Sequence, residues 1–187
     1  MKKIFLLLLM AGIVAGCMPG IRYPKTSEGI MQGAKVTEDK FKDTKWVNFS
    51  PIRPNQMSDY KKVTGVSTWG VPAGYFYVRA LQGATDTPSL VQVYFTTDYA
   101  SGWGFYHSAI DSEKNKLKFV EINRDVTSGG GYVNTVEEFA INLDWEYLKA
   151  RRDQNIIIKV YGKKQDFVFF IPDYYVDGVL KYFEGAK

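Results

Sequence analysis

The feature that most constrains this fold is a strict alternation of apolar and polar side chains in short segments. Residues 90–97 read Leu-Val-Gln-Val-Tyr-Phe-Thr-Thr, and residues 75–81 read Tyr-Phe-Tyr-Val-Arg-Ala-Leu. A period of two residues is typical of a β-strand that buries one face and exposes the other. The alternation therefore predicts paired strands that share one buried face.

Six more segments combine β-branched and aromatic residues and end at glycine, proline or polar turns: residues 46–50, 103–109, 117–126, 139–143, 155–162 and 167–171. Aromatic side chains make up 16% of the chain, a content that favours a β-rich core. Short strands joined in sequence by turns favour antiparallel pairing. We therefore predict a mainly β (β-rich α+β) fold, either an antiparallel β-sandwich or a curved sheet of about seven to eight strands.

Two segments have helical character. Residues 145–152 contain strong helix formers directly after Asp144, which is placed to cap a short helix before the last two strands. In residues 174–184, apolar side chains recur at the i, i+3, i+4 and i+7 positions of a C-terminal amphipathic helix. Gly178 lies within this helix and costs it about 1 kcal/mol relative to alanine. We expect the apolar stripe of this helix to pack on the sheet.

The charge balance argues against a nucleic-acid partner. The formal net charge is +4, and it falls to about +2 when Lys2 and Lys3 are left out. A nucleic-acid-binding domain carries a clustered basic face and a strong excess of cations. The basic pairs at residues 61–62, 151–152 and 163–164 are interpreted as solvated turn and helix-end charges, with anionic lipid head groups as the alternative.

The first seventeen residues indicate where the protein resides. Lys2 and Lys3 precede an apolar run over residues 4–14, and the small residues Ala15 and Gly16 follow. A charged start, a short apolar run and small residues before a cut are typical of a secretory signal peptide. The run has about eleven residues, which is too short to cross a ~30 Å hydrocarbon core as a helix.

The stretch Val14-Ala15-Gly16-Cys17 resembles the lipobox of bacterial lipoproteins. The resemblance implies cleavage before Cys17, a diacylglyceryl thioether on its sulfur and acylation, as with palmitate, of the new amino terminus. Cys17 is thus the expected lipidation site and the membrane is an expected partner, because two or more acyl chains give stable anchoring. By analogy with the family, Met18 after the cysteine implies transport to the outer membrane. The alternative is an ordinary signal peptide with Cys17 as a free thiol.

These features divide the chain into three parts: a signal peptide over residues 1–16, a lipidated cysteine with a flexible tether over residues 17–45, and a single β-rich periplasmic domain over residues 46–187. The tether is predicted because proline and glycine punctuate its first half, while its second half carries mixed charge without a hydrophobic period. The mature chain from Cys17 to Lys187 would have 171 residues, a length that suits one domain.

The sequence contains no recognisable catalytic or metal-binding set. His107 is the only histidine, which excludes the common zinc arrangements, and we expect no cofactor and no metal. The glycines in residues 127–131 are not followed by the Lys-Ser/Thr of a P-loop and indicate a loop between strands. No Gly-X-Ser-X-Gly elbow precedes a helix. We therefore predict that the protein is not an enzyme.

Paired carboxylates are the one enzymatic option left open. Glu137 and Glu138 are neighbours, so in a strand they point to opposite faces and cannot flank one glycosidic bond. Glu121, Asp125 and Glu138 are the candidates for an envelope hydrolase that acts on peptidoglycan fragments, the least favoured hypothesis.

The leading hypothesis is a non-enzymatic accessory or assembly lipoprotein, anchored in the outer membrane with its domain facing the periplasm, that docks onto another envelope protein. Strand edges and tyrosine-rich loops would form the docking surface. The candidate binding residues, which flank these loops, are Tyr99, Trp103, Tyr106 and Tyr132. The alternative is a module that binds a small ligand, a glycan or a lipid, in an aromatic-lined cleft of the same sheet.

Overall fold

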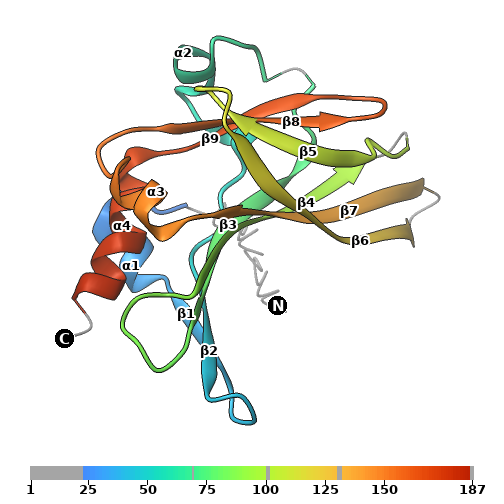
Figure 1. Cartoon of the computed structure of the whole chain (residues 1–187). Helices are drawn as coiled ribbons and strands as arrows, with labels where there is room; N and C mark the ends of the chain where they lie inside the picture. Colours follow the sequence, from blue (N-terminus) through green and yellow to red (C-terminus); the bar gives the residue numbers. More distant parts are fainter. Residues whose placement is uncertain (1–22, 69, 100–101, 130–131, 186–187) are drawn as a thin grey trace, which may run out of the picture.

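The computed structural model describes residues 23–68, 70–99, 102–129 and 132–185. Within these residues, one curled antiparallel sheet contains nine strands in the order β1-β2-β3-β4-β7-β6-β5-β8-β9 (Figure 1). The strands are β1 (Lys35–Asp39), β2 (Thr44–Asn48), β3 (Ala73–Gln82), β4 (Leu90–Tyr99), β5 (Tyr106–Asp111), β6 (Lys116–Gly129), β7 (Tyr132–Leu143), β8 (Ile156–Gly162) and β9 (Phe167–Ile171). The fold is therefore mainly β, as predicted.

The sheet bends back on itself where β5 joins β6. These two strands pair only at Ala109–Leu117 and Ile110–Lys116. Beyond this short ladder they diverge, so that β5 runs beside β8 while β6 continues beside β7 as far as Gly129 (Figure 1). The sheet thus has two parts, β1-β2-β3-β4-β7-β6 and β5-β8-β9, which enclose the core between them.

Aromatic side chains fill the inner face of the sheet. Phe95 of β4 and Phe139 of β7 stack with ring centres 5.3 Å apart, and Phe119 of β6 stacks on Phe139 at 4.9 Å. From the other part of the sheet, Phe167 and Phe169 of β9 approach Phe95 to 5.2 Å and 5.0 Å. Burial of one phenylalanine side chain stabilises a fold by up to about 3 kcal/mol, so this cluster holds the two parts together.

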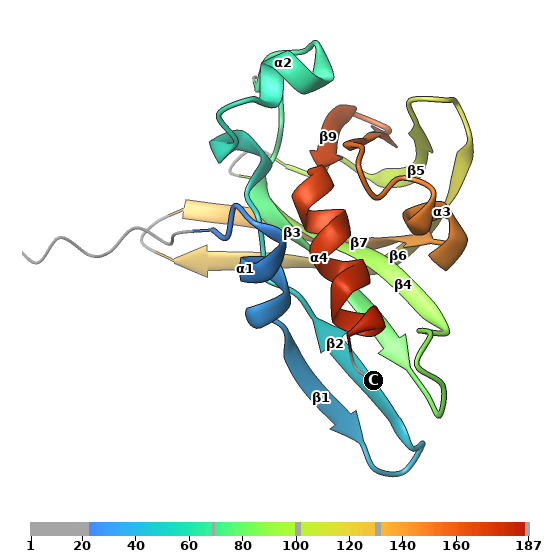
Figure 2. The same ribbon diagram turned by 90° about the vertical axis from the view of Figure 1, so that its left-hand side faces the viewer.

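Three helices lie on the inner face at one end of the sheet (Figure 2): α1 (Ser27–Gln32), α3 (Trp145–Lys149) and α4 (Asp173–Glu184). As expected, the apolar stripe of α4 is buried against the core. The buried Tyr175 hydroxyl donates to the carbonyl of Ser50 at 2.8 Å and accepts the N–H of Val78 at 3.1 Å. Burial raises the pKa of Tyr175.

Gly178 of α4 faces α1 at close range. A Cβ atom at this position would lie 2.6 Å from the carbonyl oxygen of Ser27 and 2.8 Å from Cβ of Ile30. Ile30 is completely buried in this contact region. The glycine that weakens α4 as an isolated helix is therefore what allows the two helices to pack.

The predicted number of strands and the predicted β-sandwich are not found. A single curled sheet takes the place of the sandwich, and nine strands are found in the described residues in place of seven to eight. The additional strand is β1, an edge strand whose side chains are mostly exposed. It carries no buried face, and therefore no hydrophobic alternation marks it in the sequence.

Part of the expected tether belongs to the folded domain. Residues 27–39 form α1 and β1, and Ile30 of α1 is buried against the core. The folded part therefore begins before residue 46. The expected signal peptide and the lipidation site Cys17 lie outside the described residues.

Two further short elements are the 3-10 helix η1 (Pro54–Gln56), which contacts β3, and α2 (Tyr60–Thr64). α2 packs against edge strand β9, and the Tyr60 hydroxyl donates to the carbonyl of Val168. The edge formed by β9 is thereby partly covered.

Candidate functional site

One long edge of β6 has no partner strand in the described part of the chain. β7 pairs with β6 from Lys118 to Gly129, whereas β5 covers the other side of β6 only at Lys116 and Leu117. Residues 118–129 of β6 therefore present the backbone N–H and C=O groups of an open edge. We call these residues the open edge.

Exposed apolar side chains accompany the open edge. Ile122 is 42% exposed, Val126 is 53% exposed, and Val133 on the neighbouring strand is 60% exposed. The N–H of Val126 donates to Oδ1 of Asp125 at 2.7 Å. The N–H of Val126 thus bonds to a side chain and not to a neighbouring strand, which is consistent with its position on the open edge.

A β-bulge in β6 determines which side chains meet on the inner face beside the open edge. The register with β7 shifts between Glu121 and Asn123. Without a bulge, Glu121 and Arg124 would point to opposite faces because side chains alternate along a strand. The extra residue brings both to the inner face, where Arg124 lies 2.6 Å from Glu121 and 3.2 Å from Glu137 between nitrogen and oxygen.

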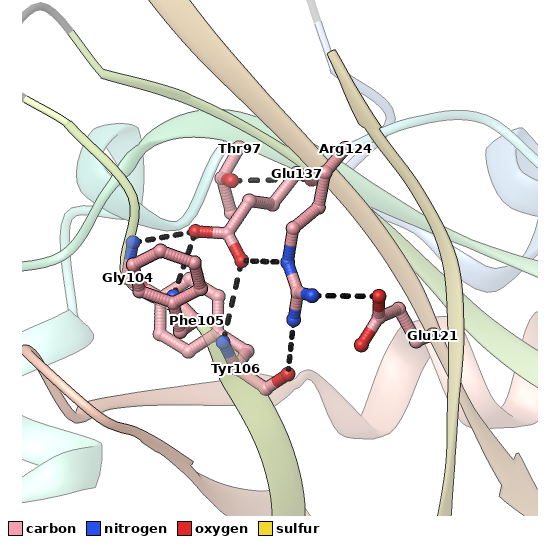
Figure 3. Close-up of polar contacts among 7 residues, drawn as sticks. All are labelled: Thr97, Gly104, Phe105, Tyr106, Glu121, Arg124 and Glu137. Atoms are coloured by element: carbon pink, nitrogen blue, oxygen red, sulfur yellow. Dashed lines mark hydrogen bonds and ion pairs between the residues drawn. The ribbon is translucent and has the colours of Figure 1, made fainter.

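Glu137 is a buried carboxylate, 2% exposed, that accepts four hydrogen bonds (Figure 3). Its Oε1 accepts the backbone N–H of Gly104 and, at 3.0 Å, that of Phe105. Its Oε2 accepts the N–H of Tyr106 at 3.3 Å and Nε of Arg124 at 3.2 Å. A buried carboxylate is costly unless donors replace water, and here three consecutive N–H groups and a guanidinium do so.

This arrangement, which we call the Glu137 clamp, fixes the connection from β4 to β5. Phe105 has a left-handed φ of 55°, which turns consecutive N–H groups toward one anion. Arg124 also donates to the carbonyl of Tyr106 at 3.2 Å, and its guanidinium carbon lies 5.4 Å from the ring centre of Phe105. The ring of Trp103 follows at 6.2 Å from that of Phe105. Glu137 and Arg124 thus hold the β4–β5 connection against the inner face of the β6–β7 hairpin.

Two predicted binding residues lie at strand ends near this connection. Tyr99 is the last residue of β4 and pairs with Thr135, while Tyr132 is the first residue of β7 and pairs with Gly129. The side chains of Tyr99 and Tyr132 are outside the described part of the structure. Trp103 lies between β4 and β5 and is partly exposed.

The expectation that Tyr106 lies on the surface is wrong. Its side chain is 1% exposed, and its ring lies 5.4 Å from that of Phe139 and 5.1 Å from that of Phe167. Tyr106 occupies an inward position at the start of β5, so it belongs to the aromatic core. Only its backbone takes part in the Glu137 clamp.

The candidate carboxylates of a hydrolase lie on both faces of the β6–β7 hairpin: Glu121 is on the inner face, whereas Asp125 and Glu138 are diagonal neighbours on the outer face. As predicted, Glu137 and Glu138 point to opposite faces: Glu137 lies in the clamp, and Glu138 contacts Tyr94 on the outer face. Glu121 pairs with Arg124, and Asp125 accepts the N–H of the residue after it. Each of the three candidates thus has its own local partner.

His107 is exposed, and its Nδ1 lies 3.1 Å from Oγ of Ser108. Among the residues that the structure describes, no three His, Cys, Asp or Glu side chains are grouped as metal ligands. No helix in the described ranges combines the length and the apolar content needed to span a membrane.

A pocket of about 450 Å³ opens at the end of the β6–β7 hairpin that lies away from its turn, where β6 begins and β7 ends. Its lining includes Lys116, Lys118, Asn142, Trp145 and Tyr147. The Tyr147 hydroxyl donates to Asp111 at 3.0 Å, and burial together with this carboxylate raises the pKa of Tyr147. The two lysines form no ion pair within the described residues. The volume lies in the range of small-ligand sites.

The pairing of Glu137 with Arg124 was not predicted from the sequence. The available signal was the position of Glu137, which shares the inward parity of Phe139 and Ile141 in an alternating strand. A charged residue on an otherwise apolar face requires buried partners.

No protein-family model, curated protein or solved structure matches this chain.

Proposed function

We propose that this protein is a non-enzymatic, lipid-anchored accessory protein of the bacterial outer membrane that docks onto another envelope protein by strand addition at the open edge. The lipobox-like Val14-Ala15-Gly16-Cys17 supports the anchor and a domain that faces the periplasm. The observation that carries the docking proposal is the unpaired side of β6 over residues 118–129.

Strand addition suits this edge because it would pair backbone groups that have no partner strand on this side of β6. In this binding mode, main-chain hydrogen bonds supply affinity and side-chain contacts supply specificity. An apolar partner strand would cover Ile122 and Val126. Because about half of each side chain is exposed, each would contribute about 1 kcal/mol. The other two edges of the sheet are less suited to strand addition. Edge strand β1 has only five residues, three of them charged, and edge strand β9 packs against α2.

The Glu137 clamp supports docking by keeping the edge in a fixed shape. The side chain of Arg124 bridges Glu137 on β7 and the Tyr106 carbonyl on β5, in the region where β5 and β6 diverge. The bond to Tyr106 fixes the start of β5 relative to the part of β6 that β5 does not pair with. A preformed edge binds with a smaller ordering cost than a flexible one.

The docking proposal is tested by blocking the edge while the β6–β7 hairpin stays intact. Val126→Pro removes an N–H that donates to Asp125 and not to a neighbouring strand, and proline is tolerated on edge strands at such positions. Val126→Thr keeps the N–H and the β-branched shape, so it is the matched control. Unchanged thermal unfolding of both variants would establish that the hairpin is intact.

In intact cells, crosslinking of the wild type should yield one dominant envelope protein, and so should crosslinking of Val126→Thr. The product should be lost with Val126→Pro. A product that survives in Val126→Pro would contradict strand addition, and so would its loss in both variants, because that result assigns the contact to the side chain.

Binding of a small ligand is a second candidate function, favoured by the pocket beside Trp145 and Tyr147. A ligand that binds only the folded state raises its stability. An envelope extract cleared of protein should then raise the Tm of the wild type, and Lys116→Gln with Lys118→Gln should reduce the increase. An unchanged Tm of the wild type would contradict this second function.

A further inference from the structure

The outer face of the sheet carries a row of polar side chains, one from each of six neighbouring strands. In the order β1, β2, β3, β4, β7 and β6, the register aligns Lys35, Asn48, Arg79, Gln92, Asn142 and Lys118. Neighbouring strands lie about 4.8 Å apart, so this outer polar row is about 24 Å long. It consists of three cations and three amides, without a carboxylate.

The hydrogen bonds within the row all run in one direction. Nε of Arg79 donates to Oε1 of Gln92 at 2.9 Å, and Nε2 of Gln92 donates to Oδ1 of Asn142 at 2.8 Å. Because a guanidinium can only donate, it fixes the orientation of both amides. Nδ2 of Asn142 remains as a donor without a partner in the described part of the chain. The row therefore presents N–H donors and positive charge to its surroundings.

Aromatic rings border the row on both sides. The guanidinium carbon of Arg79 lies 4.7 Å from the ring centre of Trp46 and 4.4 Å from that of Tyr94. The ring of Tyr77 is 5.2 Å from that of Tyr94, and Tyr75, 37% exposed, is 6.4 Å from Tyr77. Trp46 and Tyr94 thus make cation–π contacts with the guanidinium, and the rings offer apolar surfaces beside the donors.

No helix of the described chain covers this face. α1, α3 and α4 contribute to the core on the inner face (Figure 2), and α2 packs against β9. Lys35, Arg79 and Lys118 form no ion pair with any described residue. Glu138 shares the face but contacts Tyr94. The cations of the row therefore have no ion-pair partner in the described chain.

We propose that the outer polar row binds a linear acidic glycan that lies across the strands, with its sugar rings on the aromatic borders and its carboxylates at the three cations. Lys118 and Asn142 belong both to the row and to the lining of the 450 Å³ pocket, so one end of the glycan enters this pocket. The site lies on the outer face and does not depend on docking at the open edge.

The spacing of the cations favours a sparsely charged polymer. Lys35 and Arg79 are two strands apart, about 10 Å, and Arg79 and Lys118 are three strands apart, about 14 Å. A nucleic-acid strand carries one charge per ~3.4 Å, so most of its phosphates would face amides and rings. The neutral donors between the cations suit the hydroxyl groups of sugars.

The full-length protein in detergent can be tested by affinity electrophoresis in gels that contain hyaluronan, in which a uronic acid alternates with a neutral sugar, with dextran as the neutral control. We expect retardation by hyaluronan that weakens with salt, and none by dextran. Lys35→Gln with Lys118→Gln should raise the Kd for hyaluronan about tenfold. Lys61→Gln with Lys62→Gln removes the same charge from α2 and should leave the Kd unchanged.

Tyr77→Ala removes a ring and no charge, and a several-fold higher Kd for hyaluronan would support stacking on the aromatic border. The proposal is overturned if hyaluronan does not retard the wild type, if dextran retards it equally, or if both double-lysine variants weaken binding alike. Poly(dT) and phosphatidylglycerol vesicles serve as competing probes. If either binds as tightly as hyaluronan and is released by the Lys35 and Lys118 changes, the row is a nucleic-acid or a membrane site and the glycan proposal fails.

Discussion

The Glu137 clamp leads to a specific prediction for stability. Glu137→Gln keeps the shape of the side chain but replaces one acceptor oxygen with an NH₂ group. Each carboxylate oxygen of Glu137 accepts two hydrogen bonds. Either orientation of the glutamine amide therefore sets its NH₂ group against two N–H donors, at a site where the native side chain is 2% exposed.

The expected loss follows from the number and type of these bonds. A hydrogen bond to a charged group contributes about 1.5–3 kcal/mol. Arg124 keeps Glu121 as a partner and is 27% exposed, which limits the cost on its side. We expect the free energy of unfolding to fall by about 3 kcal/mol, and the Tm of a domain of this size to fall by about 6–12 °C.

Urea unfolding followed by tryptophan fluorescence measures this loss. Arg124→Met serves as the comparison, because three backbone N–H groups still neutralise Glu137, and its cost should be smaller, about 1–2 kcal/mol. A loss of less than about 1 kcal/mol for Glu137→Gln, or a larger loss for Arg124→Met, would refute the view that the carboxylate organises the β4–β5 connection.

Three further predictions concern the core and its pH dependence. Gly178→Ala should cost about 2 kcal/mol in thermal unfolding, although alanine favours helix, because its Cβ would meet the Ser27 carbonyl at 2.6 Å; a higher Tm would contradict the close packing. Burial by itself raises the pKa of Asp111, but hydrogen bonds from its neighbours outweigh this effect and lower the pKa. The wild type therefore has stability above about pH 4 that it loses as the pH falls further. Asp111→Asn should give a flatter acid limb in urea titrations, and an equal slope would count against this cause. Tyr175→Phe leaves the N–H of Val78 and a carbonyl unpaired in the interior and should cost about 2 kcal/mol in urea unfolding; a neutral result would contradict the assigned bonds.

The alternating strands were predictable because their period of two residues already marks which side chains are buried. β9 spans Phe167–Ile171 as predicted, and α4 begins within one residue of its predicted start. Phe76, Val78 and Ala80, placed on one face by their spacing, are at most 1% exposed. Local residue type and burial agree in these elements, so the pattern was sufficient.

β1 and α1 could not be predicted in this way. β1 lies at the sheet edge and has no buried face, and Ile30 is the one fully buried side chain of α1. A single buried residue gives no hydrophobic period. Pairing with the next strand, β2, stabilises β1, and contact with α4, which is remote in sequence, stabilises α1. The local pattern therefore predicts a tether where tertiary packing forms structure.

The candidate sites depend on register, which local sequence does not specify. The bulge after Glu121 changes which face Arg124 occupies, and a simple alternation places Arg124 on the wrong side. The outer polar row is assembled from six strands that only the pairing register aligns. Glu137, a charged residue at an inward position, was the one feature of these sites that the sequence pattern alone could have indicated.

The most direct test of the docking role is site-specific photo-crosslinking in intact cells. p-Benzoylphenylalanine replaces Ile122 on the open edge or, as the control, Val66 after α2. Both native side chains are 42% exposed, so the two positions differ in location and not in accessibility. The docking proposal predicts one dominant envelope protein crosslinked from position 122, none from position 66, and loss of the product when Val126→Pro is added. Equal products from both positions, or no product from position 122, would contradict docking at the open edge of β6.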